Sequence, residues 1–312
     1  MKHETVLITG GTGLIGKRLT SYLIKEGYDV IILSRKAQPS STAGISYALW
    51  NIEEQKIDGA AIQQADYIIN LAGAGVMDKS WTADYQRKII DSRTLSSQLL
   101  IKGLSENKNK VKAIVAASAI GWYGEDKHPI IHARGFTEID PPAQNFLGET
   151  CRLWEESIEP VTKMNIRLIR LRIGIVLSKE GGAFLEFLKP IKLGIAAILG
   201  SGKQVISWIH IDDLCRLFTR SITEETMHGT YNAVSETPVT NKHLIMKTAN
   251  RLRKAFVIPI HVPSFILRVM LGQRSTEILK SATVDNAKIK GEGFEYIYPT
   301  LEAALIELTS SV

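Results

Sequence analysis

The sequence predicts an α/β protein with a Rossmann-type, doubly wound parallel sheet and a smaller, mixed C-terminal substrate region. Three observations support this fold class. Short apolar runs alternate with amphipathic helical patterns, a glycine-rich turn joins the first run to the first helix, and the alternation ends near residue 177. Parallel strands that are covered by helices on both faces are expected to be almost continuously apolar, as these runs are.

The first predicted unit is a strand, a helix and a second strand. Val6–Thr9 is an apolar run that stops at glycines, an amphipathic pattern follows from Leu14 to Leu23, and Asp29–Ser34 is the next apolar run. The same criteria predict further strands at 66–70, 112–117 and 167–172, and helices at 84–104 and 149–158.

The change of pattern predicts two parts of the chain. Residues 1–176 are expected to form a dinucleotide-binding domain, which a segment at about 204–233 completes. Residues 177–203 and 234–312, with glycine-punctuated loops and short apolar segments, are expected to form a smaller substrate-binding region. In open α/β folds the ligand lies at the carboxyl ends of the strands, so this region is expected to lie over those ends.

The composition is that of a globular protein. The 312 residues are 45% hydrophobic and 22% charged, with a mean hydropathy of +0.01. No apolar stretch reaches the roughly 18 residues that a membrane span needs, so no membrane contact is expected. The first residues lead directly into an apolar strand, which is unlike a secretory signal. Cys151 and Cys215 are far apart and suggest no disulfide framework or zinc site, so we expect a cytoplasmic protein.

The formal net charge is +6 and the isoelectric point is near 9.1. Basic residues become more frequent toward the C-terminus, but they are spread among apolar residues without a dense run or interleaved aromatic residues. This pattern favours a solvated basic face over a nucleic-acid partner. We therefore expect a small-molecule substrate, no nucleic acid, no membrane, and a monomer or homodimer.

The segment 9–16 (TGGTGLIG), which we call the phosphate turn, has the pattern of a dinucleotide-binding turn. Gly10 permits a tight turn, Gly13 lets the backbone approach a pyrophosphate, and Gly16 lets the helix pack on the strand. The N-terminus of the helix offers free N–H groups to the anion. A glycine-rich turn without a ligand is the alternative. Its position between a strand and a helix favours binding, with Thr12, Leu14 and Ile15 also in contact with the cofactor.

The end of the second strand predicts which coenzyme binds. NAD-binding proteins usually carry an acidic residue there to bind the ribose 2′-hydroxyl, but this strand ends Leu33-Ser34-Arg35-Lys36. A 2′-phosphate would be repelled by a carboxylate, whereas Arg35 can bind it with a bidentate fork and Ser34 can donate a hydrogen bond. We therefore predict NADP(H). The alternative is that Arg35 and Lys36 are ordinary surface residues.

The strand at 66–70 also ends in small residues. Leu71, Ala72 and Gly73 follow Asn70, as is needed where a backbone passes close to a cofactor. A simple tight turn is the alternative interpretation of this segment.

With these motifs the sequence resembles the extended short-chain dehydrogenase/reductase family, and in particular its atypical subfamily often labelled "epimerase family protein". The resemblance covers nearly the whole chain in order. It implies that Leu71, Ala72, Arg93 and Val176 line the cofactor site, with core or solvated positions as the alternatives. It rests on TGGTGLIG (9–16), LSRK (33–36), NLAGAGV (70–76), SAIGWYG (118–124), FLGETCRLWE (146–155), RLRIGIVLSKEGGA (170–183), GSGKQVISWIHIDDL (200–214) and GTYNAVSETPVTN (229–241).

The resemblance also shows that two of the family's usual catalytic residues are missing. Typical family members use a serine at the end of the fifth strand and a downstream Tyr-x-x-x-Lys, whose lysine lowers the pKa of the tyrosine. Ser118 occupies the serine position. The tyrosine and lysine positions fall on Phe146 and Thr150 or, shifted by one residue, on Leu147 and Cys151. Neither register supplies a phenol or an amine.

Three hypotheses remain for the chemistry. Tyr123 could act as a substitute acid from the loop after Ser118, or it could be part of a structural Tyr-Gly turn. Glu138, His128 or His132 could serve instead. Otherwise the protein binds NADP(H) without the usual reaction. A histidine and two carboxylates at 210–213 resemble a metal cluster, but they match the strand-to-helix junction of the family, where Asp212 or Asp213 would cap the helix. No metal is predicted.

We therefore predict an NADP(H)-dependent oxidoreductase or epimerase-type enzyme that acts on an unknown small substrate, with Ser118 and Tyr123 as candidate catalytic residues. The alternative is a catalytically impaired NADP(H)-binding protein with a regulatory or partner-binding role. Its ligand or partner surface would include Gly181-Gly182 and the apolar run at 262–271 (VPSFILRVML), although a buried helix is the ordinary explanation of that run.

Overall fold

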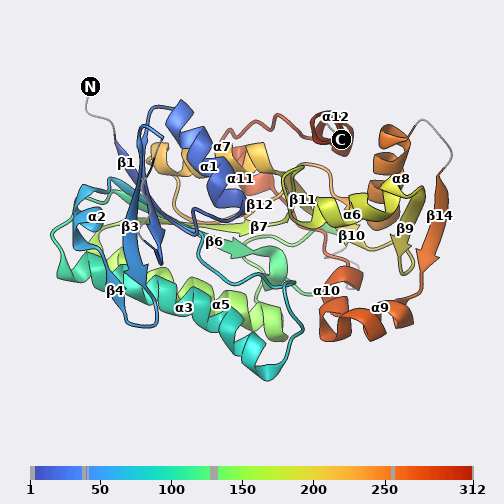
Figure 1. Cartoon of the computed structure of the whole chain (residues 1–312), viewed down its shortest axis with the longest axis horizontal. Coiled ribbons are helices and arrows are strands. Elements are labelled where there is room, and N and C mark those ends of the chain that lie inside the picture. Colours follow the sequence, from blue (N-terminus) through green and yellow to red (C-terminus); the bar gives the residue numbers. More distant parts are fainter. Residues whose placement is uncertain (1–3, 37–39, 41, 127–132, 254–256, 311–312) are drawn as a thin grey trace.

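The structure is a computed structural model that describes residues 4–36, 40, 42–126, 133–253 and 257–310. A sheet of eight strands forms its centre (Figure 1), in the order β12-β7-β6-β5-β1-β2-β3-β4. All neighbours in this sheet are parallel except β3 and β4. The strands are β1 (Thr5–Thr9), β2 (Asp29–Ser34), β3 (Ile45–Asn51), β4 (Lys56–Ile57), β5 (Tyr67–Asn70), β6 (Ala113–Ala119), β7 (Arg167–Ile173) and β12 (Gly229–Ala233).

The chain order reverses on either side of β1, because β2 and β5 both pair with it. Ligands of open α/β sheets bind outside the carboxyl ends of the strands at such a reversal. The predicted Rossmann-type fold class is therefore confirmed, and the carboxyl edge of β1, β5 and β6 is the region to search for a site.

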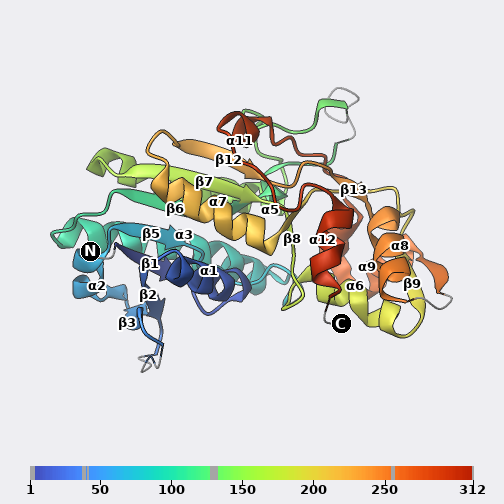
Figure 2. The ribbon, with the colours of Figure 1, turned by 90° about the horizontal axis from the view of Figure 1, so that it is seen from above.

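Helices cover both faces of this sheet, so the side chains on both faces of its strands are apolar. Within β1, Val6 and Ile8 pack in the cluster that contains Leu19 of α1, whereas Leu7 packs in the cluster that contains Leu99 of α3. Figure 2 shows these layers from above. One face carries α1 (Leu14–Lys25) and α7 (Ile211–Thr223), and the other carries α2 (Gly59–Gln64), α3 (Ala83–Glu106) and α5 (Phe146–Ile158).

The remaining elements form a second region at one end of the sheet (Figure 1). Phe184, Trp208 and Leu305 are among the buried residues of its core. Its elements are three small sheets, β8 (Ile175–Leu177) with β11 (Trp208–His210), β9 (Ile195–Leu199) with β14 (Ile258–Val262), and β10 (Val205–Ile206) with β13 (Val239–Thr240), and the helices α6 (Ala183–Lys192), α8 (Asn241–Leu252), α9 (Ser264–Leu271), α10 (Ser275–Leu279) and α12 (Leu301–Leu308). The exception is α11 (Ala287–Gly291), which packs against β12 of the central sheet.

The apolar run at 262–271 does not form the buried helix that its composition suggests. It contributes the end of β14 and the helix α9, in which Leu267 is buried while Phe265 and Val269 are 67% and 83% exposed. The alternative explanation of this run as a buried helix therefore does not hold for α9, which packs against the adjacent segment 272–274 and α10 and leaves much of its apolar surface exposed. As for membranes, none of the helices in the described ranges has both the length and the apolar character for a span.

Candidate functional site

The phosphate turn lies at the carboxyl end of β1, where α1 begins. Gly10 adopts a φ of +67°, and a Cβ atom there would lie 2.8 Å from the carbonyl oxygen of Leu71 on the neighbouring strand end. A Cβ atom on Gly16 would lie 2.4 Å from the carbonyl oxygen of Gly10. Only glycine fits both positions, because the turn, the helix and the end of β5 are packed backbone to backbone.

The start of α1 is suited to bind an anion. Its N-cap is Gly13, which provides no side-chain hydrogen bond, and its first turn contains no acidic residue. The N–H groups of the first turn therefore have no capping partner and retain the positive end of the helix dipole. Thr12 and Gly13 are exposed beside these groups. These features fit the pyrophosphate of a dinucleotide.

A buried polar link, which sequence reasoning missed, holds the two strand ends at this turn. The hydroxyl of Thr9 donates to Asn70 Oδ1 over 2.7 Å and accepts the backbone N–H groups of Leu71 and Ala72 at 3.0 Å. Thr9 and Asn70 are both fully buried. The signal in the sequence is a pair of polar residues that end two apolar strands, since such residues need a partner when buried.

Ser34 is the last residue of β2 and Arg35 follows it, next to the phosphate turn in the sheet. The Ser34 hydroxyl accepts the N–H of Lys36 over 3.3 Å, and Arg35 is exposed. Within the described residues Arg35 makes no ion pair, and β2 ends without a carboxylate. A free guanidinium at this position is suited to a phosphate rather than to a ribose hydroxyl.

Arg93 of α3 lies beneath the loop that follows β5. Its Nη1 donates to the carbonyl oxygens of Ala74 and Ile89, and its guanidinium stacks 4.8 Å from the centroid of the Trp154 ring. Burial lowers the pKa of Arg93, and no described carboxylate pairs with it. The contact with the loop at 71–74 shows how Arg93 holds this segment. A direct contact with the cofactor remains a prediction.

Leu14 is the first residue of α1, and Val176 lies in β8. Both are partly buried against the core of the sheet. Leu14 packs directly beneath Gly181 and Gly182, since Cβ atoms on these glycines would lie 3.2 and 3.1 Å from its methyl groups. The loop at 181–182 therefore closes over the start of α1.

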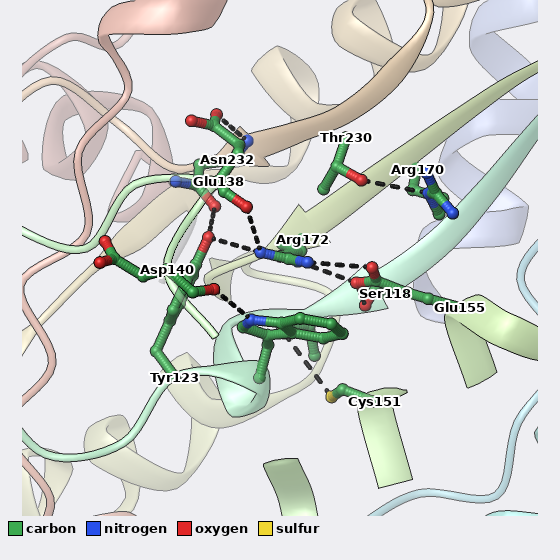
Figure 3. A network of polar contacts seen from close by, with 12 residues as sticks. Ser118, Tyr123, Glu138, Asp140, Cys151, Glu155, Arg170, Arg172, Thr230 and Asn232 are labelled. Carbon is green, nitrogen blue, oxygen red and sulfur yellow. Dashed lines mark hydrogen bonds and ion pairs between the residues drawn. The ribbon is translucent and has the colours of Figure 1, made fainter. Parts of the chain in front are cut away.

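Ser118, at the end of β6, belongs to a buried polar network (Figure 3). Its hydroxyl donates to Glu155 Oε1 over 2.7 Å, and Arg172 of β7 binds both carboxylate oxygens of Glu155 at 2.8 and 3.0 Å. The side chains of Arg172 and Glu155 are only 3% and 7% exposed. The sequence signal for this network, which sequence reasoning also missed, is a pair of opposite charges inside an apolar strand and an apolar helix face.

Tyr123 extends this network to β12. Its hydroxyl donates to Asn232 Oδ1 over 2.7 Å and accepts Arg172 Nη1 at 3.0 Å (Figure 3). The Tyr123 side chain is fully buried and stacked on Phe136, and burial raises its pKa to about 12. A phenol that is buried, doubly hydrogen-bonded and harder to ionise is a poor proton donor, so this geometry favours the structural interpretation of Tyr123.

Glu138 serves the same network, because its carboxylate accepts the N–H of Asn232 and its carbonyl oxygen accepts Arg172. The other two candidates from this loop, His128 and His132, lie outside the described residues. Tyr123 and Glu138, two of the candidates to replace the missing tyrosine, therefore both have hydrogen-bond partners within the described part of the chain.

Packing distinguishes the two registers that the sequence allows for the family's tyrosine and lysine, which are Phe146 with Thr150 and Leu147 with Cys151. Leu147 and Cys151 of α5 lie under Gly121, and Cys151 Sγ contacts the carbonyl oxygen of Ala119 at 3.6 Å. Phe146 instead packs edge-on against Trp81, with ring centroids 4.9 Å apart. The register that faces the end of β6 is thus Leu147 and Cys151. Burial raises the pKa of the Cys151 thiol to about 12, so it is not a reactive thiolate.

A cavity of about 400 Å³, which we call the Lys280 cavity, opens at this edge of the sheet. It lies between the segment before α3, the start of α5 and the segment 273–280, and it is the size of a small-molecule site. A second hollow of about 410 Å³ lies against the C-terminal end of α1 and α7, far from the strand ends where ligands bind. The lining of the Lys280 cavity is Trp81, Glu125, Asn145, Phe146, Leu147, Gln273, Thr276, Glu277 and Lys280.

The junction at 210–213 is structural, but the cap differs from the one we predicted. His210 itself caps α7, since its ring nitrogen accepts the N–H of Asp212. Asp212 binds Arg18 at 2.6 Å, and Asp213 accepts the N–H groups of Ile297 and Tyr298. The cap prediction was wrong because both carboxylates are used in contacts between distant segments. The described residues include no group of three side chains arranged to hold a metal ion.

Comparison with family models finds two matches. Residues 6–233 match the model of the NAD dependent epimerase/dehydratase family. Residues 262–308 match a domain of unknown function (DUF1731). The first match includes the phosphate turn and the central sheet, and the second includes Lys280.

Known proteins of similar sequence and structure span the whole chain. Epimerase family protein SSP1921 of Staphylococcus saprophyticus is 35% identical over 311 residues, covering 99% of each chain. The crystal structure of human epimerase family protein SDR39U1 (isoform 2) with NADPH is 28% identical, with a TM-score of 0.85 over 99% of this chain and 100% of that one. A nucleoside-diphosphate sugar epimerase from Corynebacterium glutamicum is 27% identical, with a TM-score of 0.77 over 99% of this chain and 58% of that one.

Proposed function

Because the chain belongs to the NAD-dependent epimerase/dehydratase family, we propose that it binds NADP(H) at the phosphate turn and acts as an oxidoreductase on a small organic molecule. The observation that carries the proposal is the combination of an α1 N-terminus without a side-chain cap and an exposed Arg35 after β2 that makes no ion pair among the described residues. The first fits a pyrophosphate and the second fits a 2′-phosphate. The similarity to a human protein that was crystallised with NADPH supports the choice of coenzyme.

In the proposed complex the residues of the chain have distinct tasks. The N–H groups behind Gly13 bind the pyrophosphate, Arg35 and Ser34 bind the 2′-phosphate, and Leu71, Ala72, Gly73 and Val176 line the path of the coenzyme. When bound, NADPH supplies a hydride. The loop at 181–182, which packs on Leu14, excludes water from the phosphates.

A second candidate function is an NADP(H)-binding protein without turnover. It is favoured by one observation, which is that Ser118 and Tyr123 both have internal hydrogen-bond partners and are buried. In this case NADP(H) would regulate a contact made by the region after residue 177. The two functions share the coenzyme site and differ only in whether a carbonyl compound is reduced.

The coenzyme proposal is tested by calorimetry with NADPH and NADH on the Arg35→Ala variant. A lost charge-assisted contact should weaken NADPH binding about tenfold or more, while NADH binding changes less than about twofold. Arg87→Ala, which removes an exposed arginine of α3, is the matched control and should change neither. Equal weakening of both coenzymes by Arg35→Ala would refute the 2′-phosphate assignment. Failure of the native protein to bind either coenzyme would refute the proposal altogether.

A further inference from the structure

We propose that Lys280 is the proton donor of the reaction, and that the Lys280 cavity binds a small carbonyl compound with an apolar body. The proposal rests on the proposed function, because it needs NADPH as the reductant. It replaces the missing tyrosine by a group from the other end of the chain, more than a hundred residues beyond Ser118.

The position of the cavity supports this assignment. Its walls come from segments that follow β5 and β6, so it lies at the carboxyl edge where a coenzyme and its substrate meet. Leu147, which is one of the two positions counted for the family's tyrosine, is itself part of the lining. The cavity therefore includes the place from which a proton would be delivered, although Leu147 cannot deliver one.

The C-terminal segment is fixed over this edge by polar contacts. Gln86 of α3 donates to Gln273 over 3.0 Å, and Arg274 donates to the carbonyl oxygen of Met77 over 2.8 Å. These contacts join the segment 273–280 to the start of α3. Lys280 is thus held over the strand ends by the fold.

The Lys280 ammonium has a donor left for a ligand. It binds Glu277 Oε2 at 2.7 Å and the carbonyl oxygen of Tyr123 at 3.2 Å. An ammonium has three N–H donors, and the described residues accept two of them. Its side chain is 11% exposed and is part of the lining of the cavity. The third N–H can therefore reach an oxygen of a bound molecule.

The rest of the lining indicates the class of substrate. Trp81, Phe146 and Leu147 form an apolar wall, and Glu277 is paired with Lys280. The other lining residues are polar: Glu125, Asn145, Gln273 and Thr276. A small molecule with an apolar or aromatic body and one polar oxygen matches this wall and this single ammonium. A carbonyl compound has these features.

The proposed step is a hydride transfer that is completed by a proton transfer. Hydride addition forms a C–H bond at the carbonyl carbon as a C–H bond of the reduced nicotinamide ring breaks, and the electron pair of the C=O π bond moves to oxygen. Lys280 Nζ gives one proton to that oxygen, so an N–H bond breaks and an O–H bond forms. The carbonyl is reduced to an alcohol and NADPH is oxidised to NADP⁺. The neutral amine then regains a proton from water, beside the Glu277 carboxylate that holds it in place.

The test uses NADPH with two aromatic carbonyl probes, 9,10-phenanthrenequinone and 4-nitrobenzaldehyde. Lys280→Met should bind NADPH like the native protein but lose about 100-fold or more in kcat, which is typical of a lost general acid. Lys280→Arg keeps the positive charge but holds its protons, so KM should change less than about threefold while kcat stays low. Lys189→Met is the matched control, because Lys189 pairs with Glu186 at the same i,i+3 spacing on an exposed face of α6.

Any of the following results would overturn the proposal. Native-like kcat in Lys280→Met would remove Lys280 from the chemistry, and restored kcat in Lys280→Arg would show that only its charge matters. A native protein that binds NADPH yet reduces neither probe would contradict the carbonyl site while leaving coenzyme binding intact. Failure of the native protein to bind NADPH would instead refute the proposed function on which this inference rests.

Discussion

The phosphate turn and the network around Ser118 lie at the same edge of one sheet, but they differ in whether their polar groups are hydrogen-bonded within the protein. At the turn, α1 starts without a cap and Arg35 is exposed without an ion pair among the described residues. In the network, Ser118, Glu155, Arg172, Tyr123 and Asn232 are buried and bonded to one another. Groups that are left open are available to a ligand, whereas groups that satisfy each other stabilise the fold.

This contrast changes the interpretation of the family-like motifs. The motif at 118–124 suggests catalysis because a serine and a tyrosine stand near the end of β6, but its side chains join β6, β7, α5 and β12. In the proposal above, the group with a donor left for a ligand is Lys280, which lines the Lys280 cavity and donates to Glu277 and to the carbonyl oxygen of Tyr123. Four experiments test whether the two regions differ in this way.

Arg172→Met should be strongly destabilising. It leaves the Glu155 carboxylate buried without its cation, and breaking such a pair typically costs about 3–5 kcal/mol. Urea unfolding followed by circular dichroism measures the loss. Arg152→Met removes exposed pairs with Glu149 and Glu156 on α5 and should leave the unfolding midpoint unchanged. Similar midpoints for both variants would show that the network is not a structural centre.

Tyr123 should make stability depend on alkaline pH. Burial raises its pKa to about 12, so the folded state holds the phenol proton more tightly than the unfolded state, where the pKa is about 10. Its contribution is fully present below pH 10 and is lost as pH rises toward 12, which amounts to roughly 3 kcal/mol. Denaturant midpoints of the native protein and of Tyr123→Phe should therefore converge over that range. A constant difference between the two proteins would mean that the phenol does not titrate as a buried group.

Gly13→Ala should weaken NADPH binding about tenfold or more and leave the fold intact. Gly13 has an ordinary φ of −76°, and its Cβ atom would meet only the carbonyl oxygen of Gly10, at 3.3 Å. The methyl group instead occupies space that the pyrophosphate needs. Calorimetry and thermal unfolding measure the two effects, with Gly291→Ala as a control in open space. Unchanged NADPH affinity would place the pyrophosphate elsewhere.

Ser118→Ala should have the smallest effect. The lost hydrogen bond to Glu155 costs about 1 kcal/mol, because Arg172 still binds both oxygens of that carboxylate. NADPH affinity should be unchanged, and turnover of the quinone probe should stay within about threefold of native. If Ser118→Ala loses turnover while its stability and NADPH affinity are unchanged, Ser118 takes part in catalysis. The two regions would then not differ in the way described.

Sequence reasoning located the phosphate turn because its signals are local. The conformation of Gly10 and the packing of Gly16 concern segments a few residues apart or on adjacent strands. Such features leave a mark in residue type and spacing. The strands at 29–34, 66–70, 112–117 and 167–172 and the long helix were predictable for the same reason, with α3 at Ala83–Glu106 against a predicted 84–104. The strands β3, β4 and β12 were not predicted.

The partners of Ser118 and the location of Lys280 were not predictable in this way. Arg172 and Glu155 stand 17 residues apart, and Lys280 is 157 residues from Tyr123, whose carbonyl oxygen it binds. Each of these residues alone is compatible with a solvated surface. A buried helix was the ordinary alternative explanation of the apolar run at 262–271 and does not hold for α9, since composition does not say which neighbour is available to cover a helix.

The sequence by itself determined the class of this protein, because alternating apolar runs and a glycine turn at a strand end allow few arrangements other than a parallel sheet with a dinucleotide site. The tertiary structure decided which polar groups at the edge of that sheet remain open. A side chain keeps a free donor only if no distant segment supplies its partner, and the folded chain brings Asn232 and Arg172 to Tyr123 while it brings Lys280 to the cavity.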